Sequence, residues 1–289
     1  MVPNGEYTTR INGLNLWYKI SGTGPVCIVP TPGWGPSSDM YFRTLTPFED
    51  RFTLVYLDTR GAGRSEQPKR STDYTYAHFA ADLDGLRQYL KQDKIWVMGH
   101  SRAGVDALQY ALTYPSACQG LILLDSLPAF DQIHSDDVQA RLLERQNEPW
   151  FEDAFAAFND RTMPESDEAF ARWLLKILPF YFYDQSKLEQ NRDHFAATTL
   201  SVAAWQGSSD SNSRDLNLLP RLADIHVPTL IVVGRHDFIC SPLQARRLHQ
   251  GIAGSTLIVI EQAGHLPWLE QPETFYRKVK QALPVLEAL

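Results

Sequence analysis

The sequence predicts an α/β protein with a mostly parallel, eight-stranded sheet, helices on both faces of the sheet and an inserted helical cap. Short apolar runs that fit buried strands alternate with helical patterns along most of the chain, and this alternation is typical of a parallel sheet covered on both sides. One long stretch without a convincing strand interrupts the alternation. At 289 residues, the chain can bury a large core without a disulfide or a structural metal.

The chain is expected to begin with an antiparallel hairpin. Residues 7–11 and 14–20 are predicted strands on either side of Asn12-Gly13, a pair that favours a tight hairpin turn. Continuous apolar runs predict six further strands, at residues 26–30, 52–57, 95–98, 120–124, 229–233 and 256–260. Helical patterns predict helices at residues 76–90, 105–114, 242–250 and 272–283.

The interruption in this pattern defines the predicted domains. Residues 1–126 and 225–289 are expected to form the α/β core, and residues 127–224 a helical cap above the carboxyl edge of the sheet. The cap is rich in aromatic residues, and most of them should form its own core, because aromatic side chains dominate cores. A few should face the substrate, and the candidates are Trp150, Tyr181 and Trp205.

Composition narrows the possible partners. The net charge of −7 argues against nucleic acid or an anionic membrane as the main partner. The three cysteines lie far apart, as expected for buried free thiols in a reducing compartment. Neither a secretory signal nor an apolar run of about 20 residues is visible. We therefore expect a cytoplasmic protein that acts on a small molecule, with its oligomeric state left open.

A serine at a strand–helix junction is the most informative local feature. Residues 97–104 read Val-Met-Gly-His-Ser-Arg-Ala-Gly, the setting of a nucleophile elbow, where a sharp turn exposes the serine above the carboxyl edge of a parallel sheet. Gly99 and Ala103 flank Ser101 because larger side chains would collide in so tight a turn. Ser101 itself must hold an unfavourable backbone conformation, which costs about 1–3 kcal/mol.

A serine hydroxyl needs a base, and the base needs a third group that orients it. His265 follows the last predicted strand and Asp237 follows the strand at 229–233, so both should lie at the same sheet edge as Ser101. The order serine, acid, histidine is the one expected of an α/β-hydrolase. Asp125, at the end of the strand at 120–124, could orient the same histidine, although Asp237 is favoured. His100 is interpreted as a packing or hydrogen-bonding residue.

The negative oxygen of an acyl-transfer transition state needs preorganised donors. The backbone N–H of Arg102 should be one of them, and the other should come from the loop at residues 30–35. Prolines have no N–H to donate. Gly33 and Trp34 are therefore the candidates, because Gly33 permits a close backbone approach.

The side chain of Arg102 has two competing explanations. A cation in the first turn of a helix faces the positive end of the helix dipole, which costs about 0.3–1 kcal/mol. It could be compensated by pairing with Asp106, four residues on, or with Asp125. Alternatively, the guanidinium could bind a carboxylate or carbonyl of the substrate. Arg102 and Trp34 complete the predicted substrate contacts.

No cofactor motif survives inspection. Gly61-Ala62-Gly63 begins like a dinucleotide fingerprint, but Glu66 replaces the third glycine and no strand–helix unit fits it. No pair of His or Cys has zinc spacing. We therefore expect neither a cofactor nor a metal.

The chain resembles the prolyl aminopeptidase-like (proline iminopeptidase-like) group of α/β-hydrolases over nearly its whole length. The strings that carry the resemblance lie at residues 32–35, 58–65, 97–104, 234–237 and 264–265. The resemblance implies the α/β-hydrolase fold, a triad of Ser101, Asp237 and His265, and a helical cap that shapes the pocket. Two features depart from the group: Pro30 stands where a His usually begins the oxyanion loop, and the elbow lacks the Gly-Gly-Ser-Trp-Gly of true prolyl aminopeptidases.

These observations predict a cofactor-independent serine hydrolase that cleaves an ester, lactone, thioester or amide through an acyl-enzyme. A prolyl aminopeptidase acting on small peptides is the alternative within the same class. A non-hydrolytic lyase or cyclase, or a ligand-binding protein on a hydrolase scaffold, is the alternative from another class, because a fold does not fix a function.

Overall fold

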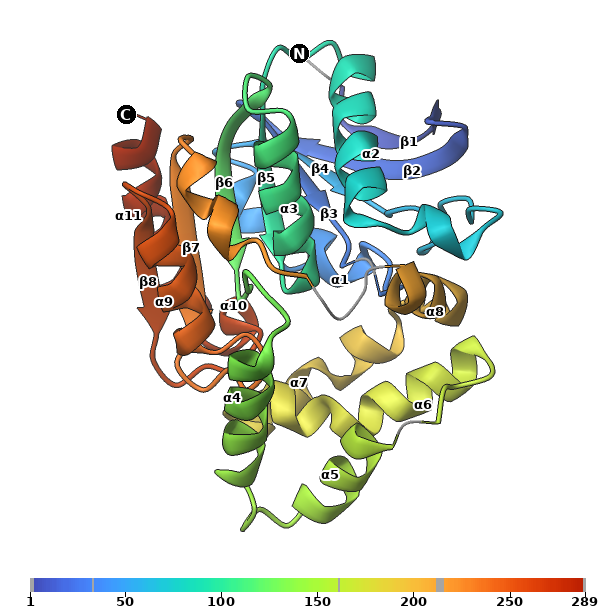
Figure 1. Ribbon diagram of the computed structural model, residues 1–289, viewed down its shortest axis with the longest axis vertical. Coiled ribbons are helices and arrows are strands. Elements are labelled where there is room, and N and C mark those ends of the chain that lie inside the picture. The colour runs from blue at the N-terminus through green and yellow to red at the C-terminus, as the bar shows by residue number, and fades with distance from the viewer. Residues whose placement is uncertain (1–2, 33, 161, 212–215, 288–289) are drawn as a thin grey trace.

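The computed structural model describes residues 3–32, 34–160, 162–211 and 216–287. Within these residues, eight strands form one sheet in the spatial order β1-β2-β4-β3-β5-β6-β7-β8 (Figure 1). The β1–β2 and β2–β4 pairs are antiparallel, and every pair from β4 to β8 is parallel, as predicted. The strands are β1 (Gly5–Ile11), β2 (Leu14–Gly22), β3 (Val26–Pro30), β4 (Thr53–Leu57), β5 (Ile95–His100), β6 (Cys118–Leu124), β7 (Thr229–Gly234) and β8 (Thr256–Ile260).

Helices cover both faces of the sheet, which explains the continuous apolar strands. In β3, Ile28 packs into one core, whereas Cys27 and Val29 pack into the other. Because successive strand side chains point to opposite faces, a strand buried on both faces must be apolar throughout. The helices that contribute to the first core are α2 (Tyr76–Tyr89), α3 (Arg102–Thr113) and α9 (Pro242–Gly251). Those of the second are α1 (Asp39–Phe42), α10 (Pro267–Glu270) and α11 (Pro272–Glu287), together with Leu188 of the inserted helix α7 (Gln185–Ala196).

Some element boundaries differ from the prediction. Helix α3 begins at Arg102, three residues before the predicted start, because the elbow turn leads directly into the helix. Helix α11 continues to Glu287, beyond the predicted end at residue 283. The predicted hairpin turn is confirmed, since Asn12 and Gly13 have φ angles of 49° and 86°, as a tight β-hairpin requires.

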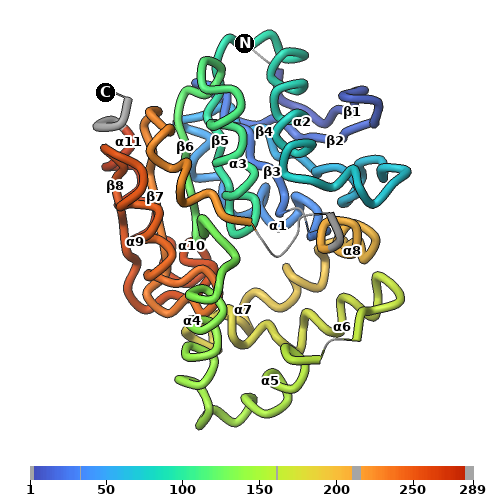
Figure 2. The backbone as a smooth tube through the Cα atoms, viewed as in Figure 1, coloured from blue at the N-terminus to red at the C-terminus, as the bar shows by residue number. Residues whose placement is uncertain are grey.

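Among the described residues between β6 and β7, the regular elements are helices, apart from one isolated β-bridge between Ala129 and Asn217. Figures 1 and 2 show α5, α6 and α7 as a layer set apart from the sheet. Asp131, Ser166 and Asp184 cap α4, α6 and α7 by accepting backbone N–H groups, as these residue types do. The inserted helices are α4 (Gln132–Leu143), α5 (Phe151–Asn159), α6 (Asp167–Ile177), α7 (Gln185–Ala196) and α8 (Val202–Ser211).

Many aromatic residues of this insertion form a core of their own, as expected. Phe151 and Phe180 pack with Val138, Leu142 and Phe238. The cysteines Cys27, Cys118 and Cys240 are buried free thiols. Over the described part of the chain, none of the helices combines the length and the apolar composition needed to span a bilayer.

Candidate active site

Ser101 occupies a strained turn between β5 and α3. Its φ and ψ are 56° and −127°, a conformation that side chains rarely adopt and that costs about 1–3 kcal/mol. Its N–H donates to the Leu124 carbonyl (2.9 Å), and its carbonyl accepts from the Ser126 hydroxyl (2.9 Å). A Cβ on Gly99 would lie 2.3 Å from the Ala103 carbonyl oxygen. The turn therefore requires the small residue that the sequence provides.

His265 and Asp237 are in direct contact with each other. Nδ1 of His265 lies 2.8 Å from Oδ2 of Asp237, and both side chains are buried. The other carboxylate oxygen, Oδ1, accepts the N–H groups of Ile239 (2.9 Å) and Cys240 (3.0 Å). Asp237 is thus held on two sides, with one oxygen directed at the imidazole. Ser101 and His265 line the same cavity.

Asp125, the competing acid, lies beside Asp237 but in a different role. Its Oδ1 accepts the Gly234 N–H at 2.8 Å. Complete burial, followed by the negative charge of Asp237, raises the pKa of Asp125 well above its ordinary range. Asp237 is the acid whose carboxylate contacts His265.

Two buried residues hold the histidine loop. Nε2 of His100 lies 3.0 Å from the His265 carbonyl, so it must donate, and the Tyr41 hydroxyl then donates to Nδ1 at 2.9 Å. Burial lowers the pKa of His100 well below its usual value. The interpretation of His100 as a local hydrogen-bonding residue is therefore confirmed.

Glu270 is the second of these residues, and sequence reasoning missed it. One carboxylate oxygen accepts the Gly264 N–H (2.5 Å), and the other accepts the N–H groups of Tyr183 (2.8 Å) and Asp184 (2.9 Å). The His265 N–H also donates to the Tyr181 carbonyl at 2.8 Å. The loop that carries His265 is therefore bound directly to the inserted segment. Burial raises the pKa of Glu270 to about 7 despite these three donors.

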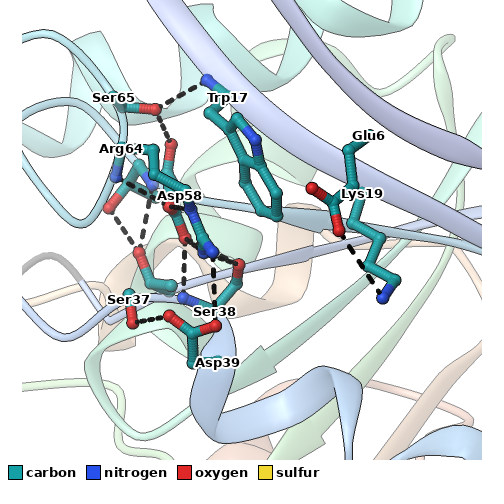
Figure 3. Close-up of polar contacts among 11 residues, drawn as sticks. Glu6, Trp17, Lys19, Ser37, Ser38, Asp39, Asp58, Arg64 and Ser65 are labelled. Carbon is teal, nitrogen blue, oxygen red and sulfur yellow. Dashed lines mark hydrogen bonds and ion pairs between the residues drawn. The ribbon is translucent and has the colours of Figure 1, made fainter. Parts of the chain in front are cut away.

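The 58–65 string supports the loop that follows β3 (Figure 3). Oδ1 of the buried Asp58 accepts the Ser38 N–H (2.7 Å) and hydroxyl (2.6 Å), while Oδ2 accepts the backbone N–H and Nε of Arg64 (2.9 and 2.7 Å). The Arg64 guanidinium also lies 3.5 Å from the centre of the Trp17 ring. We call these residues the Asp58 network; it fixes the end of the loop after β3.

The predicted oxyanion donors Arg102 and Trp34 differ in the hydrogen bonding of their backbone N–H groups. The N–H of Arg102 begins α3, and the first N–H groups of a helix have no intrahelical partner. The N–H of Trp34 donates to the Pro32 carbonyl at 2.7 Å. Trp34 is therefore not a free backbone donor here, and that prediction is corrected, because the turn at this position uses its N–H. Gly33 lies outside the described residues.

The Arg102 side chain contacts neither predicted acid. Its Nη2 donates to the Ser208 carbonyl on α8 at 2.8 Å, and its guanidinium lies 5.3 Å from the Tyr76 ring centre. Within the described ranges, its buried Nε and both carboxyl oxygens of the buried Asp106 have no hydrogen-bond partner. Burial raises the pKa of Asp106 to about 8, although Arg102 opposes the shift. Arg102 and Asp106 therefore interact through their charges without a hydrogen bond between them; we call these residues the Arg102–Asp106 cluster.

A cavity of about 290 Å³ lies above Ser101. Its lining includes Trp34, Arg102, Tyr181 and Trp205, four of the residues predicted to contact substrate, and most of the rest is aromatic or aliphatic. Phe170 stacks on Trp205 with ring centres 4.6 Å apart. Trp173 also stacks on Trp205, with ring centres 5.0 Å apart. Among the described residues, neither Asp nor Glu lines this cavity.

Trp150 is a correction to the predicted substrate contacts. It is not part of the cavity lining. Its ring instead packs edge-on against Phe180 at 5.0 Å, with the Arg145 guanidinium 5.1 Å from the ring centre. Trp150 therefore packs against the core of the insertion and is not among the lining residues of the cavity. Cys240, by contrast, lines the cavity beside Ser101 and was not predicted to do so.

Known proteins share this architecture. Residues 25–272 match the family model described as alpha/beta hydrolase fold. A proline iminopeptidase of Saccharolobus solfataricus is 26% identical, over 97% of this chain and 92% of its own length. The enol-lactonase of Burkholderia xenovorans superimposes with a TM-score of 0.72 at 24% identity, covering 96% of this chain and all of its own. An esterase of Exiguobacterium antarcticum gives 0.72 at 24% identity, with 96% and 98% covered.

The resemblance found in the sequence is thereby confirmed. The family match extends over most of the chain and includes the elbow, the residues around Asp237 and the loop of His265. The relatives are hydrolases by name. This chain therefore belongs to the alpha/beta hydrolase fold family, and proteins named proline iminopeptidase are among its relatives.

Proposed function

We propose that this protein is a serine hydrolase that cleaves an ester or lactone with an apolar acyl group through a covalent acyl-enzyme. The observation that carries the proposal is the contact of 2.8 Å between His265 and Asp237, next to a serine in an elbow turn that opens into the same cavity. In this proposal the inserted segment, residues 127–224, acts as the cap. The buried free thiols support the expected reducing, cytoplasmic setting.

The proposed reaction follows from these positions. His265 takes the proton of the Ser101 hydroxyl as the oxygen attacks the substrate carbonyl, and later donates that proton to the leaving oxygen. Asp237 keeps a proton on Nδ1, so that Nε2 is free to act as the base, and stabilises the imidazolium. Water then attacks the acyl-enzyme with His265 again as base, which releases the acid and restores Ser101.

The oxyanion requires donors near Ser101. We assign one to the backbone N–H of Arg102, which helix geometry leaves unpaired and which directly follows the nucleophile. The negative oxygen would also lie at the positive end of the α3 dipole. Gly33 stays a prediction for the second donor.

The cavity lining supports an apolar substrate without a free amino group. An amino-terminal peptide carries a cation, and burying a cation without a partner is costly. The described lining offers no carboxylate and contains the cation of Arg102. This favours a neutral or acidic substrate, with the stack of Phe170, Trp173 and Trp205 against its apolar part.

A prolyl aminopeptidase remains the second candidate, because the relative from S. solfataricus carries that name and matches nearly the whole chain. A lyase, a cyclase or a binding protein would need no acyl-enzyme. Reaction with a fluorophosphonate probe separates a serine hydrolase of either kind from a lyase, a cyclase or a binding protein, since only an activated serine is labelled.

The test combines labelling with a substrate panel. We expect the probe to modify Ser101, and Ser101→Ala to lose labelling and turnover by about 10³-fold or more while keeping its melting temperature. Esters with aromatic or medium-chain acyl groups should be hydrolysed faster than prolyl anilides. Absence of labelling would refute the serine mechanism, and preferential cleavage of prolyl anilides would favour the aminopeptidase.

A matched pair of variants tests the acid. Asp237→Asn should lower kcat by about 10⁴-fold, the size of effect known for this substitution in a serine triad. Asp125→Asn keeps the acceptor oxygen for Gly234 and should cost far less. A larger loss in Asp125→Asn would make Asp125 the catalytic acid.

A further inference from the structure

Cys240 brings a soft donor to the acid–base pair, which the proposed hydrolysis does not use. One donor atom each from Asp237, Cys240 and His265 lies within 4.8 Å of the others, and all three residues are buried. Cys240 and His265 also line the cavity. A small cation in the cavity therefore faces two of the three donors, and the third, from Asp237, lies within 4.8 Å of them.

The three donors suit one class of cation. Zn²⁺ binds thiolate, imidazole and carboxylate at about 2.0–2.3 Å, and most often in a tetrahedron. The donor atoms of such a tetrahedron are separated by roughly 3–4 Å, so the spacing here needs only a small contraction. Cd²⁺ uses the same ligand types, whereas Mg²⁺ prefers oxygen ligands and keeps its waters.

The local backbone already orders the loop that supplies two of these donors. The Cys240 N–H donates to Oδ1 of Asp237, which leaves Oδ2 to face His265. Ser101 lines the same cavity as Cys240 and His265, so its hydroxyl is the candidate fourth ligand. The site is thus held by the same contacts that hold the acid.

We propose that Asp237, Cys240 and His265 form an inhibitory site for Zn²⁺ or a cation of the same softness. On binding, the Cys240 thiol gives its proton to solvent and its sulfur bonds the metal. If the metal binds Nδ1 of His265, the ring proton moves to Nε2. If the metal binds Nε2, the lone pair of Nε2 forms the bond to the metal. In either case His265 can no longer accept the Ser101 proton, and turnover stops.

The inhibition readout rests on the proposed function, but metal binding does not, so the two are measured separately. In a buffer free of chelators, micromolar Zn²⁺ should inhibit hydrolysis of a p-nitrophenyl ester, and EDTA should restore it. Cys240→Ser and Cys240→Ala should raise the inhibitory concentration at least tenfold, relative to the uninhibited rate of each variant. Cys118→Ser, which alters a buried thiol in β6, is the matched control and should leave it unchanged.

Binding itself is followed with Cd²⁺, through the ultraviolet charge-transfer band of a cadmium–thiolate bond. We expect one Cd²⁺ per chain in the wild type and in Ser101→Ala, and none in the Cys240 variants. A serine that is labelled by the fluorophosphonate while neither metal binds would overturn the metal site and leave the hydrolase intact. Binding of Cd²⁺ by a protein that the probe never labels would support the site and refute the hydrolase. Equal binding by Cys240→Ala and the wild type would also overturn the site.

Discussion

Two regions of the molecule each bury an aspartate, but they differ in the hydrogen-bond partners that they offer its carboxyl group. In the Asp58 network, the two carboxylate oxygens accept two backbone N–H groups, a hydroxyl and a guanidinium. In the Arg102–Asp106 cluster, both oxygens of Asp106 lack a hydrogen-bond partner, and burial raises its pKa to about 8. The two buried carboxyl groups therefore differ in the number of hydrogen-bond donors that surround them.

The difference also separates scaffold from site. The Asp58 network fixes the loop after β3, where an unpaired charge would be strongly destabilising. The Arg102–Asp106 cluster lies on the helix that starts at Ser101, where polar groups without partners reduce stability. Variants in the two regions should therefore change stability in opposite directions.

The largest effect is expected at Asp58. Asp58→Ala should lower the free energy of unfolding by about 3–5 kcal/mol, because it leaves the N–H of Ser38 and the charge of Arg64 without their partner. Urea denaturation measures this loss. Asp73→Ala, which removes an exposed ion pair with Arg70, is the control and should change the midpoint little. A similar loss in both variants would show that the network has no special weight.

Glu270 is an intermediate case, since it accepts three backbone N–H groups and still has a raised pKa. Glu270→Gln should cost about 1–3 kcal/mol of stability, because an amide cannot accept from all three donors. It should also lower kcat more than it raises KM, since the His265 loop loses an anchor. Glu261→Gln, in an exposed pair with Arg235, should alter neither quantity. Unchanged kcat in Glu270→Gln would reduce Glu270 to a purely structural contact.

Asp106 should give the opposite sign. Its pKa rises from 3.8 in the unfolded chain to about 8 in the fold, so the native state binds the extra proton. This contribution is complete below pH 3.8 and is lost as the pH rises through about 8. Asp106→Asn removes the dependence, and we expect it to gain about 1–3 kcal/mol over the wild type between pH 5 and pH 8. Parallel stability curves for the two proteins over that pH range would contradict the assignment.

Arg102 should give the smallest effect and decide between its two roles. If the guanidinium binds substrate, Arg102→Gln should raise KM for a carboxylated ester about threefold to tenfold, equivalent to about 1 kcal/mol. KM for a neutral ester of the same length should hardly change. Equal losses on both esters with a lowered melting temperature would leave only the structural contact with Ser208.

Most of the fold could be predicted because its signals are local. The apolar runs of β3 to β8 and the Asn12-Gly13 turn each depend on a few adjacent residues. The proximity of Asp237 and His265 could also be predicted, since both follow parallel strands whose carboxyl ends share one edge. The predicted start of α3 is three residues too late, because the elbow leads into the helix without a separate cap residue.

The features of the site that could not be predicted from the sequence depend on contacts between distant segments. Glu270 has backbone partners in the insertion, and backbone donors leave no trace in the sequence. The direction of Trp150 depends on how α5 packs, which the spacing of aromatic residues does not reveal. Asp106 has the right spacing for Arg102 on the helix, but the guanidinium turns to the Ser208 carbonyl on α8 instead.

The bond between the His265 loop and the inserted segment has a consequence for how such an enzyme can be changed. The backbone from Tyr181 to Asp184 supports the His265 loop, through Glu270 and the His265 N–H. The insertion is therefore not a freely interchangeable module, because a grafted one would have to restore these backbone contacts. The aromatic stack of Phe170, Trp173 and Trp205 lies on other helices of the insertion. New substrate preferences are accordingly accessible by replacing these side chains one at a time, with the backbone of the insertion kept.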